Sequence, residues 1–195
     1  MRALIAENPW TTIVRAGAAG LVASHYPVLL EEESEGLAVV THVGRPDEEL
    51  HRFGDSEILL MFAGSHGYIS PSWCPQQATP VPTWNFSVAH CYGTPQVLGA
   101  QENLRVLTRL VDHFERHVQD PVALDQVIGA RVAAGTVGLR VPITRFVCKV
   151  KMSQGEDAQT WERVLDALRS PGPYSNPELA LDMQRALERS STEPS

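Results

Sequence analysis

The chain has 195 residues, of which 43% are hydrophobic and 20% are charged, a composition typical of a globular protein with a substantial core. Sixteen Lys and Arg against 23 Asp and Glu give a formal net charge of −7, which disfavours direct binding to nucleic acid. Neither a signal-peptide pattern nor an apolar run long enough to span a bilayer is found, so we expect no membrane association.

The beginning of the chain predicts one short helix followed by β-strands. Residues 1–7 should form a helix that ends where an Asn-Pro pair follows, because the residue before a proline is driven out of the helical region. Strands are expected over residues 11–15 and 21–31, joined by a glycine-containing hairpin turn. A second turn then leads to a strand over residues 37–43.

The next segment predicts one or two helical turns and then more strands. The helical turns fall within residues 46–53, and residues 57–63 form a continuous apolar run of strand length. Strands buried on both faces have this pattern, so we expect the run to be buried on both sides. Residues 68–72 and 81–97 are expected to be extended, the second long enough to bend around a barrel.

The pattern changes to a helical period from Gln101 onward. Three-and-four spacing predicts an amphipathic helix whose apolar face is formed by Leu104, Leu107, Val111, Phe114 and Val118. Asp120-Pro121 resembles a helix N-cap followed by proline at the first helical position. A second helix is therefore expected to start there and to run toward Ala134.

The C-terminal part predicts one long strand, over residues 136–152, and two more helices. The first helix has an apolar stripe formed by Trp161, Val164, Leu165 and Leu168. The second begins at Asn176-Pro177 and places on one face Leu179, Met183 and Leu187. A series of strands followed by helices favours a small β-barrel with helical additions.

Residues 64–93 are the most distinctive stretch of the sequence. They hold two of the four Trp, two of the four Tyr and four Pro, among Ser, Thr, Asn and His. Polar donors scattered among rings, on a backbone fixed by prolines, are typical of a binding wall. The sequence lacks the common phosphate-loop, dinucleotide, zinc-protease and serine-hydrolase motifs, so any chemistry must come from scattered residues or from a cofactor.

Six segments closely resemble, in order, motifs of the PaiB family of FMN-binding negative transcriptional regulators. They are S-H-Y-P (24–27), T-H-V-G-R-P (41–46), H-G-Y-I-S-P-S-W (66–73), V-P-T-W-N-F (81–86), H-C-Y-G (90–93) and P-I-T-R-F-V-C-K-V-K-M-S-Q (142–154). Each segment alone is short, but their combination is specific. The chain departs from the family pattern at Cys74, where Tyr is usual, and at Gly155-Glu156, where an Asn-Arg pair is typical.

The resemblance implies a split β-barrel related to pyridoxamine-phosphate oxidase and flavin reductases, in which two protomers build two cofactor sites at their interface. The expected protein is thus mainly β, an FMN-binding split barrel with peripheral and C-terminal helices, and a homodimer. Residues 1–170 would form the FMN-binding domain, and residues 171–195 a C-terminal helix with a flexible tail.

One group of candidate cofactor-binding residues carries cations that suit a phosphate. His42 and Arg45 lie where a predicted strand ends, and a guanidinium binds phosphate through two hydrogen bonds. Lys149, Lys151 and Ser153 share one face of a predicted strand, because side chains alternate. Structural roles stay open for both sets: a surface ion pair and a hydrogen-bonded histidine, or a strand edge protected by lysines.

A second group would enclose a flat ring, with the indoles stacking on it and Asn or Ser reading its edge. This group consists of Tyr68, Ser70, Trp73, Trp84 and Asn85. Gln154, at the end of the last motif, is a further cofactor candidate. Packing of the barrel or of the dimer interface stays open for Trp84.

Cysteines and paired histidines are not expected to form a site. Cys74, Cys91 and Cys148 fit neither a zinc site nor a disulfide framework, which favours a cytoplasmic protein. No base or helix N-terminus is placed beside Cys74 or Cys91, so both are interpreted as packing residues. His113 and His117 could together hold a metal, but a solvated helix face is the preferred interpretation.

Two functions stay open. The first is an FMN-binding protein of the PaiB type, acting as a transcriptional regulator or as a flavin-dependent oxidoreductase of unassigned substrate. The second follows from haem-dependent piperazate synthases, which resemble this family and form an N–N bond from N5-hydroxyornithine. In that case His42 would be the axial haem ligand, and Arg45 or Lys149 would hold a propionate. FMN is preferred, because the S-P-S-W and V-P-T-W-N-F segments are intact.

Overall fold

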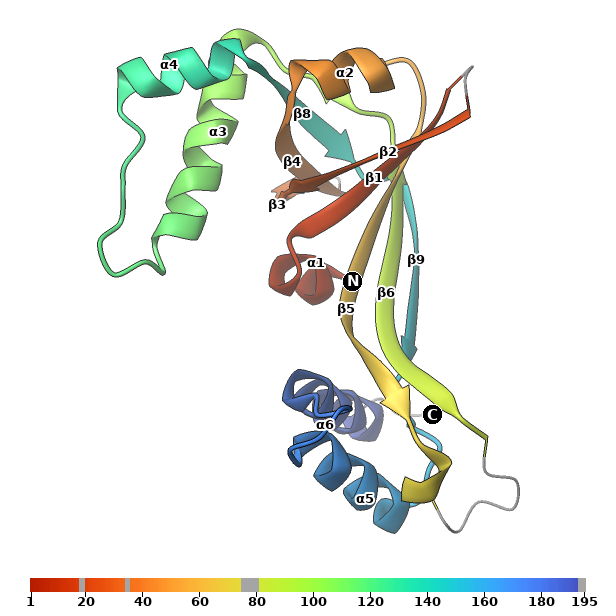
Figure 1. Ribbon diagram of the computed structural model, residues 1–195. Coiled ribbons are helices and arrows are strands. Elements are labelled where there is room, and N and C mark those ends of the chain that lie inside the picture. Colours follow the sequence, from red (N-terminus) through yellow and green to blue (C-terminus); the bar gives the residue numbers. More distant parts are fainter. Residues whose placement is uncertain (18–19, 34–35, 75–80, 193–195) are drawn as a thin grey trace. The chain divides into compact units, whose positions relative to one another are not determined.

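A computed structural model describes the chain except for residues 18–19, 34–35, 75–80 and 193–195 (Figure 1). The strands are β1 (Trp10–Gly17), β2 (Gly20–Pro27), β3 (Leu29–Glu33), β4 (Gly36–Gly44), β5 (Ile58–Ile69), β6 (Thr83–Gly93), β7 (Gln96–Val97), β8 (Thr136–Pro142) and β9 (Arg145–Lys151). The helices are α1 (Arg2–Glu7), α2 (Arg45–His51), the 3-10 helix η1 (Pro71–Trp73), α3 (Ala100–Glu115), α4 (Gln126–Ala134), α5 (Ala158–Arg169) and α6 (Pro177–Thr192). None of these helices is both long and apolar enough to cross a membrane.

The chain folds as two compact units. Unit 1 contains Met1–Phe62 and Ala89–Val147, and unit 2 contains Ala63–Val88 and Cys148–Ser195. Three strands, β5, β6 and β9, contribute residues to both units. Helices α1 to α4 belong to unit 1, and α5 and α6 belong to unit 2.

The strands form two sheets (Figure 1). One has five strands in the order β2-β1-β5-β6-β9, and the other has four in the order β3-β4-β8-β7. The pairs β1–β2, β1–β5, β3–β4, β4–β8 and β7–β8 are all antiparallel. The four-stranded sheet lies within unit 1, and α3 packs on it through a cluster that joins Leu29 and Val40 to Val106 and Leu110.

Each unit has its own apolar core. In unit 1, side chains from β1, β4, β5 and β8 meet around Ile13, Leu60 and Leu139, which are fully buried. In unit 2, α5 and α6 pack together through the predicted stripe of α5 and through Leu179 and Met183 of α6. The predicted stripe is therefore confirmed, whereas Leu187, which we expected on the same face as Leu179, is 42% exposed.

The predicted beginning of the chain is confirmed except in two places. The expected strand over residues 21–31 is two strands, β2 and β3, which belong to different sheets, and the apolar run in β5 is covered differently than expected. The first helix, the β1–β2 hairpin and the short helix after β4 form as expected. The apolar run 57–63 is not buried on both faces, because Ile58, Leu60 and Phe62 are buried while Leu59 and Met61 are half-buried. One face of this strand packs on the core and the other is partly open.

Two predictions for the helical hairpin α3–α4 were wrong in detail. Helix α3 buries Asn103, Val106, Leu107 and Leu110, so its covered face is rotated from the predicted one, and Phe114 is 39% exposed. Helix α4 is capped by Asp125 and not by Asp120. The Asp125 carboxylate accepts hydrogen bonds from the amides of Val127 and Ile128 at 2.7 and 2.8 Å, which satisfies two otherwise unpaired donors.

The predicted strand over residues 136–152 is two strands, β8 and β9, which belong to different sheets. The break falls at Ile143 and Thr144, whose amides donate to Leu37 and Tyr92. The last helix, α6, continues to Thr192, into the part of the C-terminus where we expected a flexible tail. Residues 193–195 of that tail lie outside the described part of the chain. The two predicted turns include residues 18–19 and 34–35, which also lie outside it.

Candidate functional site

The distinctive stretch, residues 64–93, provides the end of β5, the helix η1 and all of β6. Pro71 occupies the first turn of η1, and the Ser70 hydroxyl caps that turn by accepting from the Ser72 amide at 3.3 Å. The Ser70 and Ser72 hydroxyls also contact each other at 2.8 Å. This cap fixes the position of Trp73, whose amide donates to the Ser70 carbonyl.

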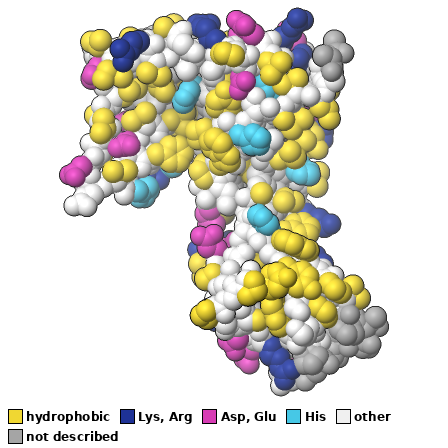
Figure 2. Space-filling view, in the orientation of Figure 1, with side chains coloured by type: hydrophobic (Ala, Val, Ile, Leu, Met, Phe, Trp, Pro, Cys, Tyr) yellow, Lys and Arg dark blue, Asp and Glu magenta, His cyan; other side chains and the backbone are white. Residues whose placement is uncertain are grey.

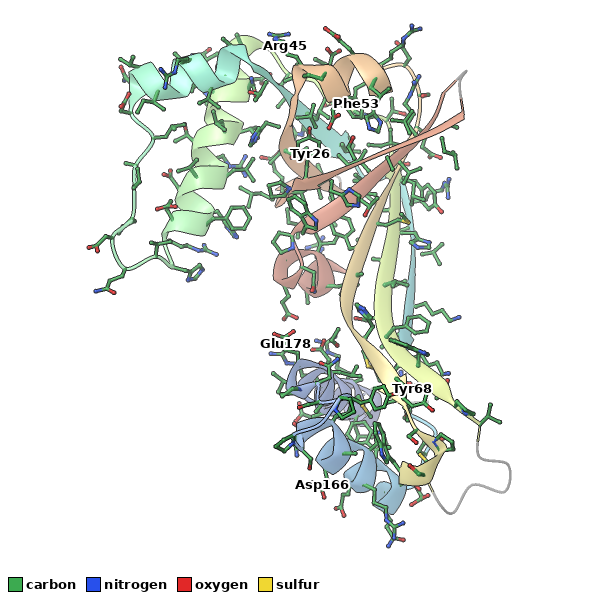
Figure 3. All side chains as sticks on the ribbon, in the orientation of Figure 1. Tyr26, Arg45, Phe53, Tyr68, Asp166 and Glu178 are labelled. Carbon is green, nitrogen blue, oxygen red and sulfur yellow. The ribbon has the colours of Figure 1, made fainter. Side chains whose placement is uncertain are left out.

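Aromatic rings from four segments of unit 2 gather around Tyr68 (Figure 3). The centroid of the Tyr68 ring lies 6.5 Å from that of Trp73, 6.4 Å from that of Trp84 and 5.0 Å from that of Tyr174. The His66 ring stacks on Trp84 at 6.4 Å. Trp84 and Tyr174 are 54% and 53% exposed, so this aromatic cluster presents ring surface to a ligand or a partner.

Two members of the cluster were not predicted from the sequence. Tyr174 lies in the loop between α5 and α6, far along the chain from the motifs, and it contacts both Tyr68 and Trp73. His66 precedes Tyr68 by two residues and therefore lies on the same face of β5. An aromatic residue within a Pro-Gly-rich loop was the only sequence signal for Tyr174.

Asn85 and Ser153 face each other within unit 2. The Asn85 amide nitrogen donates to the Ser153 hydroxyl at 2.9 Å, and that hydroxyl and the Asn85 oxygen lie 3.2 Å apart. Asn85 is fully buried and also contacts the sulfur of Met183. Ser153 has a positive φ of 58°, and its carbonyl accepts from the Trp161 indole at 2.9 Å. This network anchors the turn that follows β9.

The two lysines of β9 are exposed on the strand next to β6. Lys149 Nζ lies 5.4 Å from the centre of the Phe86 ring, and Lys151 Nζ donates to the Thr83 hydroxyl. Gln154 is bound to the backbone at the end of the strand: its oxygen accepts from the Met152 amide at 2.8 Å. The lysines therefore remain accessible while Gln154 is held in the turn.

His42 and Arg45 belong to unit 1, whereas the other predicted cofactor residues belong to unit 2. His42 lies on β4 opposite Gly138, and its buried Nδ1 has no hydrogen-bond partner among the described residues. Burial lowers the pKa of His42, which favours the neutral imidazole. Arg45 begins α2, is exposed, and donates from Nε to the Ala134 carbonyl at 2.9 Å.

Four cavities described in the structure are lined by residues of unit 1. One of about 610 Å³ is bounded by Arg45, the start of α3 and the end of α4. Three others, of about 490, 510 and 190 Å³, lie along α3 and all include Arg109. The aromatic cluster of unit 2 thus forms an exposed surface and borders none of these four cavities.

Cys74 and Cys91 pack in cores, as the sequence predicts, whereas Cys148 is exposed. Cys91 is in the core of unit 1 and Cys74 in the core of unit 2, where burial first, then Glu156 and Asp157, raises the pKa of the thiol. Burial and the nearby Arg116 and His117 lower the pKa of His113. Within the described ranges, no group of three or more His, Cys, Asp or Glu side chains is arranged to hold a metal.

The sequence model of a protein family described as "Putative FMN-binding domain" matches residues 1–145. The chain belongs to this family. The match includes β1 to β8 and the motifs up to H-C-Y-G, but it ends before Lys149 and the C-terminal helices. It confirms both the predicted family and FMN as the expected cofactor.

A similar protein supports the same family assignment over a longer part of the chain. Protease synthase and sporulation protein PAI 2 of Bacillus subtilis is 25% identical over 189 residues, which cover 95% of this chain and 90% of the relative. An uncharacterised protein of Saccharomyces cerevisiae, YKL070W, is 30% identical over 103 residues, or 49% of this chain and 61% of the relative.

Solved structures confirm the predicted fold class of this chain. The FAD and haem binding protein from Mycobacterium smegmatis has a TM-score of 0.59 at 16% identity, covering 84% of this chain and 74% of that one. The flavocytochrome Anf3 from Azotobacter vinelandii has a TM-score of 0.55 at 15% identity, covering 76% and 64%. The fold is mainly β with helices, of the split-barrel type.

Proposed function

We propose that the protein is a flavoprotein that holds the FMN ring against the aromatic cluster of unit 2. The supporting observation is the exposed ring surface of Trp84 and Tyr174 around Tyr68. A flat, polarisable ring system gains from stacking on exposed aromatic side chains. The side chains of Asn85 and Ser153 are hydrogen-bonded to each other and hold the turn after β9. We therefore assign these two residues a positioning role and not a direct contact with FMN.

The FMN phosphate is assigned to the lysines of β9. Lys149 and Lys151 are exposed and, being two residues apart on one strand, present their ammonium groups on the same face. The chain has only two lysines, and both lie here. A phosphate placed between them gains charge-assisted hydrogen bonds in a protein whose overall charge is negative. His42, Arg45, Ser70, Trp73 and Gln154 remain further candidates for cofactor contact.

Lys151→Ala is expected to weaken FMN binding and to leave riboflavin binding unchanged, because riboflavin lacks the phosphate. A hydrogen bond to a charged group contributes about 1.5–3 kcal/mol, so the FMN dissociation constant should rise about tenfold or more. Quenching of flavin fluorescence during titration measures both constants. Arg163→Ala, an exposed cation on α5 of the same unit, is the matched control. Equal losses for FMN and riboflavin would place the phosphate elsewhere.

We propose a homodimer in which β9 contributes to the interface. Strand β9 is an edge of the five-stranded sheet, and all seven of its residues are exposed. Phe146, Val147 and Val150 are each at least 50% exposed, and apolar side chains on an open edge strand favour association with another chain. A molar mass of 21.4 kDa by light scattering at micromolar concentration would contradict this.

For the reaction, we propose a flavin-dependent oxidoreductase of unassigned substrate, located in the cytoplasm. The net charge of −7 opposes direct DNA binding, so a regulatory role would need a partner that carries the DNA contact. No disulfide joins cysteines in the described part of the chain, which agrees with a reducing compartment. Bleaching of the bound flavin by NADH or NADPH tests the proposal, and a flavin that neither reduces would contradict it.

Haem is the second candidate cofactor, and His42 is the observation that favours it. Burial lowers the pKa of His42 and so favours the neutral imidazole, which is the form that binds iron. Histidines that bind metals usually donate their other ring N–H to an oriented partner, and the His42 Nδ1 has none among the described residues. This missing partner ranks haem below FMN.

The spectrum of the purified protein separates the two cofactors. We expect the two broad bands of an oxidised flavin and no Soret band. If a hemin-loaded protein does give a Soret band, His42→Ala should abolish it, while His25→Ala, an exposed histidine of β2, should not. A Soret band that survives His42→Ala would exclude this residue as the axial ligand.

A further inference from the structure

A hollow of about 490 Å³ lies within unit 1 and is lined by residues from α1, from β3 and the residues just before β1 and β3, and from the second half of α3 and its C-cap. Its volume falls in the range of small-molecule sites, about 300–1,000 Å³. None of the residues that we assign to FMN or haem lines it. The hollow is therefore a second candidate site, independent of the cofactor proposed above.

One side of the hollow is apolar. Its lining there is formed by Ile5, Ala6, Pro9, Val28, Leu29 and Leu30. Ile5, Val28 and Leu29 are buried, and Ile5 and Val28 also belong to the core of unit 1, so this wall is fixed by packing. A preformed apolar wall favours a ligand with a hydrocarbon or aromatic body.

The opposite side is charged and comes from a single face of α3. Arg109, Asp112, His113 and Arg116 follow three-and-four spacing and therefore line up along the helix. Figure 2 shows that charged and histidine side chains are interspersed with hydrophobic ones on the visible face of unit 1. The hollow thus combines an apolar wall with a polar rim, the arrangement that suits an amphipathic molecule.

The charges around the rim leave one positive charge in excess. Arg109 pairs with Glu31, and Glu31 also binds Arg140 at 3.2 Å. Among the side chains that line the hollow itself, the two guanidinium groups of Arg109 and Arg116 stand beside one carboxylate, that of Asp112. In a chain with a net charge of −7, this local excess is what a monoanion would neutralise.

Arg116 is the cation best placed to bind that anion. Its Nε donates to His117 Nε2 at 3.0 Å, and its terminal nitrogens have no partner among the described residues. A guanidinium offers two parallel N–H groups that match the two oxygens of a carboxylate. Asp112, one turn away on the same face, would repel a second negative charge on the ligand.

We propose that this hollow binds an amphipathic monocarboxylate, such as a medium-chain fatty acid, with its apolar body against Ala6, Pro9 and Leu30, which retain accessible surface in the lining. The carboxylate lies on Arg116, and the rim selects against neutral and cationic analogues of the same length. A dianion is disfavoured by Asp112.

Calorimetric titration of the full-length protein with sodium octanoate tests the site. We expect saturable binding at one site per chain and clearly weaker binding of 1-octanol, which has the same body without the charge. Arg116→Gln should weaken octanoate about tenfold or more and leave octanol unchanged. Arg131→Gln removes an exposed cation on α4 that lines none of the described cavities, and should change neither.

A second variant tests the apolar wall. Ala6 is exposed on α1, so Ala6→Trp can fold, and the indole should fill the hollow and abolish binding of both ligands. The circular dichroism of each variant verifies its fold. The proposal is overturned if octanoate does not saturate, if octanol binds equally well, or if either Arg116→Gln or Ala6→Trp binds octanoate like the wild type.

Discussion

Replacing Gly93 with alanine is expected to lower the free energy of unfolding by about 3 kcal/mol, the upper end of the range for overpacking. Gly93 ends β6, and a Cβ there would overlap the carbonyl oxygen of Pro142 and lie 3.0 Å from the side chain of Val141. Because that oxygen belongs to the backbone of β8, it cannot rotate away as the end of a side chain could. The end of β6 and the end of β8 would have to move apart to accommodate the added methyl group.

Gly36→Ala is the matched control for this prediction. Gly36 also lies at the end of a strand of unit 1, and a Cβ at this position meets nothing within 4 Å. Its effect should stay within about 0.5 kcal/mol. Urea unfolding followed by circular dichroism gives both values. If the two variants unfold at the same urea concentration, the close approach between Gly93 and Pro142 does not exist in solution.

Periodic packing could be predicted from the sequence, whereas the choice between similar local signals could not. The stripe of α5 was identified because its large apolar residues recur at the helical period and all of them are buried. Asp120 and Asp125 are both competent N-caps, and Asp120 even precedes a proline. The cap at Asp125 is decided by where the chain turns back along α3, which is a tertiary contact invisible to local sequence.

The error in β5 has a similar cause. Leu59 and Met61 are as apolar as the buried Ile58 and Leu60 beside them, yet they lie on the less covered face of the sheet. Hydropathy cannot separate a strand covered on both faces from a strand with one partly open apolar face. The number of layers that cover a sheet depends on how the whole chain folds.

For the candidate site, the motifs predicted the neighbours that lie close in sequence. Tyr68, Trp73 and Trp84 come together because a helix of one turn and two adjoining strands carry them. Tyr174 joins them from the loop after α5, so its place depends on how α5 and α6 pack in unit 2. The proposed ring-binding surface therefore needs the C-terminal helices, which lie beyond the family match.

Trp84→Ala is expected to weaken FMN and riboflavin equally, by about 10- to 100-fold, because the isoalloxazine ring common to both loses its stacking surface. Stacking of a heteroaromatic ring on an aromatic side chain contributes about 1–3 kcal/mol. Trp84 is 54% exposed, so its removal should leave the unfolding transition nearly unchanged. Flavin fluorescence titration measures both affinities, and Trp84→Phe should restore most of the loss.

Trp10→Ala is the control for the loss of an exposed indole. Trp10 is 62% exposed, stacks on His25, and belongs to unit 1. The Trp10→Ala variant should bind FMN and riboflavin with the same affinity as the wild type. Lys151→Ala distinguishes FMN from riboflavin, whereas Trp84→Ala should not, so the two variants together separate the phosphate contact from the ring contact. If Trp84→Ala binds both flavins normally, the flavin ring does not stack on Trp84.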